Sequence, residues 1–263
     1  MTTLSRPLRV VESELLAYRR TWRGTIISSF VNPILFLTAM GLSLGTLVDS
    51  RAGGALAVPY LTFVATGLMA ATAMQSGAGD GAFPVMAGIK WRKEFHGAIT
   101  TPIDPTDIVL GRAIWGAMRL TFVLVVFAVI AVLFGAMDLG PALLAVPPGV
   151  LTGLAFQAAV TAFTVTREDD TSLSTMFRFG IIPLFLFSGT FFPISQLPDF
   201  LQGVAYVTPL FHGVELVRKI ALPNVDESVV TSMPVWVHLA YLGVMWALGL
   251  FLAARWLDKR LRP

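Results

Sequence analysis

Long apolar segments dominate the chain and restrict it to a membrane-spanning fold. Only 13% of the 263 residues are charged, whereas soluble domains carry about 25%. An apolar run of about 20 residues is long enough to cross the hydrocarbon core as a helix. The predicted fold class is therefore all-α and integral to the membrane, with six transmembrane helices at Thr25–Leu47, Pro59–Ala78, Ile108–Phe134, Ala142–Val165, Ser174–Phe192 and Pro234–Trp256.

Basic residues indicate the orientation of these helices, because cytoplasmic connections carry an excess of Lys and Arg. Only Arg51, Arg218 and Lys219 fall on the outer side. We therefore expect a multi-pass protein of the cell (plasma or inner) membrane with both termini in the cytoplasm. We expect no cleavable signal peptide, because the first apolar run begins near Thr25 and is long enough to span. The predicted cytoplasmic side carries Arg6, Arg9, Arg19, Arg20, Arg23, Lys90, Arg92, Lys93, Arg112, Arg167, Arg178, Arg255, Lys259, Arg260 and Arg262.

Residues 1–24 are predicted to form an amphipathic helix that lies in the membrane interface on the cytoplasmic side. Ser5 can cap its start, and Pro7 falls in the first turn, where proline is tolerated. Arginines fill the polar face and an aromatic residue ends the helix, a pattern typical of interfacial helices. The apolar residues recur at helical spacing and are Leu4, Leu8, Val11, Leu15, Tyr18 and Trp22.

The stretch Phe187–Lys219 is apolar but is interrupted by Pro193, Pro198 and Pro209. A proline removes a backbone donor and clashes with the preceding turn, so no unbroken spanning helix crosses this stretch. Two short apolar pieces remain, roughly Leu197–Val207 and Leu210–Leu222, each too short at ~1.5 Å per residue to span a core of ~30 Å. Residues 193–222 are therefore predicted to form re-entrant or interfacial helices between the fifth and sixth spans, on the extracytoplasmic side; the alternative is an ordinary loop.

Residues 85–107 form the longest predicted cytoplasmic connection. Within it, Lys90–Ile99 can form a short helix with Trp91, Phe95 and Ile99 on one side. Such a helix is a docking element for a partner's groove, or else it packs on the protein's own bundle. The other cytoplasmic connection, Thr166–Thr171, is a compact charged turn.

Some residues of the predicted spans bear on helix packing. The segment Ala65–Ala82 is rich in Gly, Ala and Thr, which let neighbouring helices approach closely. Arg119 lies inside the third span, where a charge is a functional candidate, but we expect its side chain to reach the cytoplasmic interface. Asp104, Asp107 and Asp138 lie near span ends and are expected to be interfacial.

The sequence lacks a complete motif for ATP binding or for nucleophilic catalysis. No G-x-x-x-x-G-K-[ST] loop occurs, so the chain is not itself a P-loop ATPase. An intramembrane serine protease could use Ser188 as nucleophile and His238 as base. That chemistry needs a glycine two residues before the serine, where this chain has Leu186.

Metal sites are equally poorly supported by the sequence. A membrane prenyltransferase would need two aspartate-rich motifs to hold magnesium, and Asp169-Asp170 is a single pair. The chain has no cysteine, and His96, His212 and His238 are too scattered to predict a metal site. We therefore predict neither a catalytic nor a metal site.

The run Ser188–Arg218, SGTFFPISQLPDFLQGVAYVTPLFHGVELVR, closely resembles the signature of type-2 ATP-binding-cassette (ABC) export permeases. It looks most like the branch that handles nodulation lipo-oligosaccharides and anthracycline drugs such as daunorubicin. The resemblance covers nearly the whole chain, since residues 1–24 resemble the family's elbow helix and Glu94–Pro102 its coupling segment. Gly97 and Pro102 fit the family pattern there, whereas Ala98-Ile99-Thr100 replace its usual threonine-leucine-glutamate step.

This resemblance implies a non-catalytic permease subunit of an exporter that moves lipid-linked or amphiphilic molecules. Two permease subunits, identical or homologous, would pair above two P-loop ATPase subunits. The ATPases would bind ATP and magnesium, and this chain would bind no cofactor. The implied ATPase-coupling residues are Trp91, Arg92, Lys93, Glu94 and Phe95, and the implied outer-gate residues are Phe191, Phe192, Pro193, Leu197 and Pro198.

Other functions stay open at the level of sequence. Within transport, drug efflux is the alternative to glycolipid export. An intramembrane enzyme, protease or prenyltransferase-like, would work without an ATPase partner. A structural scaffold would show no substrate-dependent effect.

Overall fold

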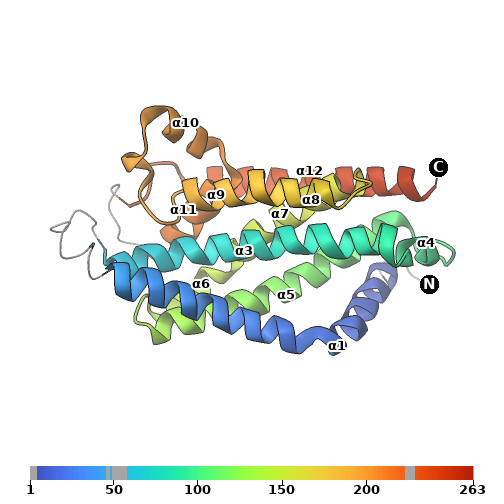
Figure 1. Cartoon of the computed structure of the whole chain (residues 1–263), viewed down its shortest axis with the longest axis horizontal. Coiled ribbons are helices and arrows are strands. Elements are labelled where there is room, and N and C mark those ends of the chain that lie inside the picture. Colours follow the sequence, from blue (N-terminus) through green and yellow to red (C-terminus); the bar gives the residue numbers. More distant parts are fainter. Residues whose placement is uncertain (1–4, 46–47, 49–57, 223–228, 263) are drawn as a thin grey trace.

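The computed structural model describes residues 5–45, 48, 58–222 and 229–262, and all regular elements in these ranges are helical (Figure 1). The long helices run side by side along the long axis of the molecule. The start of α1 and the end of α12 lie at the same end of the bundle (Figure 1). We call this the terminal end, and the opposite one the far end. The predicted all-α class is confirmed for the described residues.

Five long helices and several short ones make up the bundle. The long ones are α1 (Ser5–Phe36), α3 (Tyr60–Met86), α5 (Pro105–Leu133), α7 (Val146–Val165) and α12 (Val235–Leu261). The π-helical segments Leu37–Leu44 and Ala87–Trp91 extend α1 and α3, and a third, Phe177–Ile181, joins α8 (Thr171–Met176) to α9 (Ile182–Phe187). The remaining helices are α4 (Glu94–Ala98), α6 (Leu139–Leu144), the 3₁₀ turn Ile194–Gln196, α10 (Asp199–Val207) and α11 (Pro209–Ala221).

Four helical segments of the described chain are long and apolar enough to cross a membrane: Arg6–Gly41, Pro105–Leu133, Leu139–Val165 and Val235–Leu261. They correspond to the first, third, fourth and sixth predicted spans, although the predicted end of the first, Thr46 and Leu47, lies outside the described residues. The second, α3, has 27 residues but is not apolar enough. The fifth is a shorter apolar helix, Thr171–Phe187. The count of six spans therefore stays a prediction.

The predicted interfacial helix and the first span form one helix, α1, which changes direction along its length (Figure 1). Its N-terminal part packs on α5, where Val10 is buried and Tyr18 meets Trp115 edge to face, with ring centroids 5.3 Å apart. Leu8 and Leu15, two residues of the predicted apolar face, point outward and are about half exposed, at 54% and 46%. Trp22 is also exposed, Val11 and Tyr18 are half-buried, and Leu4 lies outside the described residues.

Helix α3 forms the centre of the bundle, where it packs on α7, α11 and α5. Its small residues allow this, as the sequence predicted. A Cβ atom on Gly77 would collide with the carbonyl oxygen of Gly153 on α7, and one on Gly81 would lie only 2.5 Å from the carbonyl oxygen of Gln157. The backbones of α3 and α7 are therefore in direct contact at these two places.

Two short helices after the fifth predicted span match the two apolar pieces left by the prolines. Pro198 immediately precedes α10, and Pro209 is the first residue of α11, where its fixed φ suits a helix start. The Thr208 side chain caps α11 by accepting a hydrogen bond from the Phe211 backbone. Helix α10 stands apart from the long helices (Figure 1). Whether these helices re-enter the membrane stays a prediction.

Replacement of Gly77 by alanine should destabilise the bundle, because the new methyl group has no room against α7. The expected loss is about 1–3 kcal/mol, as for other overpacked cores. Gly79→Ala is the matched control on the same helix, since a Cβ there meets no atom within 4 Å. Thermal unfolding of the purified protein in detergent measures both. Equal midpoints for the two variants would contradict the close contact of α3 with α7.

Candidate functional site

The segment predicted to dock a partner lies at the terminal end, between α3 and α5. The sequence predicts one helix over Lys90–Ile99, but the structure divides it: the helix continued from α3 ends at Trp91, and α4 begins at Glu94. Lys93 breaks the helix because its backbone is left-handed, with φ +55°. The side chain of Trp91 is 51% exposed. Arg92 and Lys93 are exposed as well, so this short break presents a mixed polar and aromatic surface.

Phe95 differs from its four neighbours in the predicted coupling set because it faces the bundle. It is 5% exposed and packs on Gly88, where a Cβ would overlap the aromatic ring. The guanidinium of Arg112 on α5 lies 5.9 Å from the ring centroid, within cation–π range. The ring of Phe95 therefore links the exposed segment to the interior.

Arg112 belongs to a buried cluster of charges that joins α1, α3 and α5. Its guanidinium forms an ion pair with Glu14 on α1 and donates a 3.0 Å hydrogen bond to the backbone carbonyl of Asp80 on α3. The carboxylate of Asp80 in turn pairs with Arg119 at 2.9 Å. Gln157 on α7 donates to the backbone carbonyl of Arg112 at 3.2 Å. Four helices thus meet at one electroneutral set of two arginines and two carboxylates.

Whether Arg119 reaches the cytoplasmic interface stays a prediction, but the structure gives its side chain a partner on a neighbouring helix. Its side chain is only 25% exposed and turns inward to Asp80, whose side chain is 9% exposed. A buried carboxylate attracts the guanidinium because each charge would otherwise lack a partner in an apolar medium. Asp80 itself escaped the sequence reasoning. It is the only charged residue of α3, and a lone charge in a run of small and apolar residues was the signal that could have found it.

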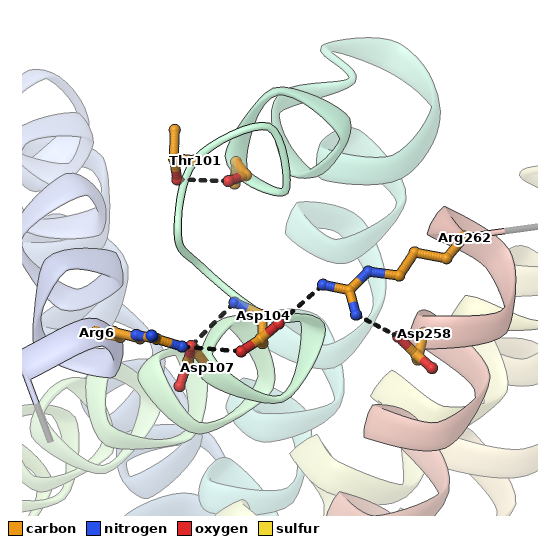
Figure 2. A network of polar contacts seen from close by, with 7 residues as sticks. Arg6, Thr101, Asp104, Asp107, Asp258 and Arg262 are labelled. Carbon is orange, nitrogen blue, oxygen red and sulfur yellow. Dashed lines mark hydrogen bonds and ion pairs between the residues drawn. The ribbon is translucent and has the colours of Figure 1, made fainter. Parts of the chain in front are cut away.

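A second polar network ties the two ends of the chain to the start of α5 (Figure 2). Asp104 caps α5 through a capping box with Asp107. Its carboxylate also accepts from Arg6 on α1 at 2.9 Å and from Arg262, just past α12, at 2.8 Å. The Arg262 hydrogen bond, followed by the charges of Arg262 and Arg6, holds the pKa of Asp104 below its usual value. Asp104 is therefore more than an interfacial residue at a span end.

The two connections at the terminal end touch each other. Lys90 donates a 2.6 Å hydrogen bond to the backbone carbonyl of Glu168, in the turn between α7 and α8. Arg260 near the end of α12 donates to the carbonyls of Val165 and Arg167 in the same turn. Hydrogen bonds from Ser172 lower the pKa of Asp169, so its carboxylate holds the start of α8 rather than a metal ion.

The predicted outer-gate residues gather at the far end. Phe191 is buried and meets Phe185 edge to face at 4.9 Å, and its backbone carbonyl accepts from the Tyr60 hydroxyl at 3.1 Å. Phe192 contacts both the main core and a smaller cluster of Ile194, Leu197, Ala205 and Phe211. Pro193 is half-buried, and Pro198 is exposed. All but Pro198 therefore pack together.

Arg218 holds this far-end segment against α3 and was missed as a site residue. It is 2% exposed, and its guanidinium lies 3.7 Å from the ring centroid of Phe63. It donates to the backbone carbonyls of Phe63 at 3.1 Å and Gly189 at 2.8 Å. Gly189 turns the chain there with φ +81°. In the sequence Arg218 counted only as a basic residue of the outer side, although it falls within an apolar run.

The histidines and the serine considered for catalysis form no catalytic pair. Ser188 hydrogen bonds Thr208 at 3.0 Å, whereas the Nδ1 atom of His238 lies 2.9 Å from that of His212. Two of the three histidines are therefore not scattered, contrary to the prediction. Among the described residues no group of three or more His, Cys, Asp or Glu side chains could hold a metal ion.

Comparison with known proteins agrees with this architecture. The sequence profile described as ABC-2 type transporter matches residues 8–222, which is most of the chain. The chain belongs to this family. It is 28% identical over 249 residues to nodulation protein J of Sinorhizobium fredii (strain NBRC 101917 / NGR234), covering 94% of this chain and 90% of that protein.

Two further relatives support the assignment. Nodulation protein J of Rhizobium meliloti (strain 1021) is 28% identical over 251 residues, covering 94% of this chain and 91% of the relative. The inner membrane transport permease YadH of Escherichia coli (strain K12) is 23% identical over 237 residues, covering 89% and 91%. This ABC-2 permease is a non-catalytic, multi-pass transport subunit, which rules out the alternative of an intramembrane enzyme.

Asp104→Asn should make the stability of the permease less dependent on pH. The folded pKa of Asp104 is lowered, so its carboxylate stabilises the fold above the unfolded pKa of about 3.9 and loses this effect as the pH falls through the folded value. Asparagine can still cap the helix, but it removes the charge and one of the two oxygens that accept from Arg6 and Arg262. Unfolding midpoints of wild type and variant should therefore differ at pH 7 and converge towards pH 3.

Asp138→Asn is the matched control for this measurement. Asp138 also precedes a helix, α6, but its exposed side chain has no hydrogen bond or ion pair within the described ranges. This variant should follow wild type at every pH. A gap between wild type and Asp104→Asn that is the same at pH 7 and pH 3 would refute the role assigned to the carboxylate.

Proposed function

We propose that this permease is the membrane subunit of an ATP-driven exporter of lipid-linked or amphiphilic molecules in the inner membrane, with its terminal end in the cytoplasm. The excess of Lys and Arg in the connections at this end supports the orientation. The name of one relative, an inner membrane transport permease, supports a transport role and this location. The cargo class is supported by the resemblance of Ser188–Arg218 to the branch that handles nodulation lipo-oligosaccharides. Drug efflux remains the alternative cargo class.

The observation that carries the proposal is the link from an exposed docking segment to buried charges. Trp91, Arg92, Lys93 and Glu94 offer an aromatic side chain and charges of both signs to a P-loop ATPase. Directly behind them, Phe95 packs under Arg112, which touches α1 and α3. A partner that moves this segment would therefore act on three helices together.

The far end would then serve as the outer gate. Phe191, Phe192 and Leu197 are apolar and packed, so they would exclude water and ions until neighbouring helices separate. Arg218 would hold these residues against α3, because its guanidinium donates hydrogen bonds to the backbone carbonyls of Phe63 on α3 and of Gly189 just before the gate residues. Two permease subunits, identical or homologous, would enclose the path, with two ATPase subunits that bind ATP and magnesium below.

The docking segment is tested by replacing its aromatic anchor. Permease purified gently from its native membrane should carry a P-loop ATPase, and Trp91→Ala should reduce the bound ATPase about tenfold or more, since a buried aromatic anchor contributes roughly 2 kcal/mol to an interface. Trp236→Ala is the control, because Trp236 is more exposed than Trp91, 68% against 51%, but lies in the first turn of α12 at the far end. Equal losses in both variants, or no ATPase with wild type, would contradict the proposal.

The gate is tested by placing a charge within this apolar cluster. Phe192→Asp should let a small fluorescent anion leak from vesicles that contain the permease, or stall ATP-dependent export, because the carboxylate brings water into the apolar contact. Phe200→Asp lies in the same far-end segment at a position that is 73% exposed, and it should behave as wild type. Both variants should insert normally. Unchanged permeability and export with Phe192→Asp would sink the gate assignment.

A further inference from the structure

A cavity of about 650 Å³ opens at the terminal end between the starts of α1 and α5 and the last turns of α12. It lies beside the Asp104 network of Figure 2 and is not part of the docking segment or the outer gate. Its charged lining includes Arg6, Asp107 and Arg255, and its apolar lining includes Leu110, Leu250 and Phe251.

Along one face of α12, the residues that line the cavity change from apolar to charged. Phe251, Arg255, Asp258 and Arg262 all line the cavity, and their spacing of four, three and four residues puts them in one row along the helix. From Phe251 to Arg262 the row extends about 17 Å at ~1.5 Å per residue. Along α12 towards the end of the chain, the cavity therefore presents the apolar side chain of Phe251, then the cation Arg255, the anion Asp258 and the cation Arg262.

Two of the three charged residues in this row, Arg255 and Asp258, are available to a ligand. Arg6 and Arg262 are both engaged by Asp104. Arg255 is exposed and has no hydrogen bond or ion pair within the described part of the chain. Asp258 has one oxygen 3.5 Å from Arg262, which leaves its other oxygen free to accept.

The depth of the cavity matches the boundary of a bilayer. Both α5 and α12 are candidate spans, and Arg262 lies just past the end of α12. Leu110 is 41% exposed and Phe251 is 59% exposed, so the deeper part of the cavity faces hydrocarbon, while the rim lies at the level of the headgroups.

We propose that this cavity binds one amine-bearing zwitterionic phospholipid, such as phosphatidylethanolamine. Its phosphate would pair with Arg255, its ammonium with Asp258, and the first part of its acyl chains would lie along Phe251, Leu250 and Leu110. The six charged lining residues comprise three arginines and three aspartates, which favours a headgroup with both signs over an anionic one. In the orientation proposed above this is a lipid of the inner leaflet; the binding does not depend on which cargo is exported.

The test is to measure which lipids stay on the full-length permease. The protein is reconstituted in an equal mixture of phosphatidylethanolamine and phosphatidylglycerol, extracted with mild detergent and washed, and the retained lipids are counted by mass spectrometry. Wild type should keep about one phosphatidylethanolamine per chain. Arg255→Ala should lower its retention about tenfold, as expected for losing one charge-assisted contact.

Two further variants make the result specific. Lys259→Ala, which removes an exposed cation of the same helix turn that does not line the cavity, should retain lipid as wild type does. Asp258→Asn should keep a lipid but lose the preference for phosphatidylethanolamine over phosphatidylglycerol. Equal loss in Arg255→Ala and Lys259→Ala, a wild-type preference for phosphatidylglycerol, or no retained lipid would each overturn the proposal. None of these outcomes bears on ATPase binding, so the two proposals fail separately.

Discussion

The buried charge cluster around Arg112 is the interaction on which the terminal half of this permease depends. In an apolar medium an unpaired charge costs several kcal/mol, so Glu14, Asp80, Arg112 and Arg119 have to stay together. They come from three different helices, α1, α3 and α5. The cluster therefore fixes the rotation and the depth of α1 and α3 relative to α5, which nonspecific packing of Leu, Val and Ala side chains does not do.

The far half of the bundle is organised in the same way by a different cation. Arg218 is almost fully buried and donates hydrogen bonds to the backbone carbonyls of Phe63 and Gly189. A nearby acidic residue, Glu215, accepts instead from Thr231 at 2.7 Å. Backbone carbonyls are acceptors that do not titrate, so this contact holds the segment after α9 at any physiological pH. Helix α3 is thus bound by an arginine near each of its ends.

Much of this fold follows from the sequence, because the apolar length, the prolines and the small residues act locally. Pro198 and Pro209 predict where short helices begin, and the run of small residues in Ala65–Ala82 predicts a close helix contact. The partners of single charges do not follow, since they are set by tertiary contacts. Arg218 meets Thr66 across 152 residues of sequence, and His212 meets His238 across 26. The partner of Arg119 is Asp80, which lies on another helix.

The contacts of α3 explain how motion at one end can reach the other. Backbone contact at Gly77 and Gly81 brings α3 and α7 closer together than larger side chains would allow, so we expect the two helices to move together. Asp80 sits next to these glycines and holds Arg119, while Phe63 and Thr66 of the same helix hold Arg218. A shift of the docking segment acts on Arg112 through Phe95, and Arg112 binds the backbone of Asp80. In the transport cycle proposed above, a small displacement of this segment would change how Phe191, Phe192 and Leu197 are held at the far end, because packed interfaces switch between arrangements rather than deform gradually.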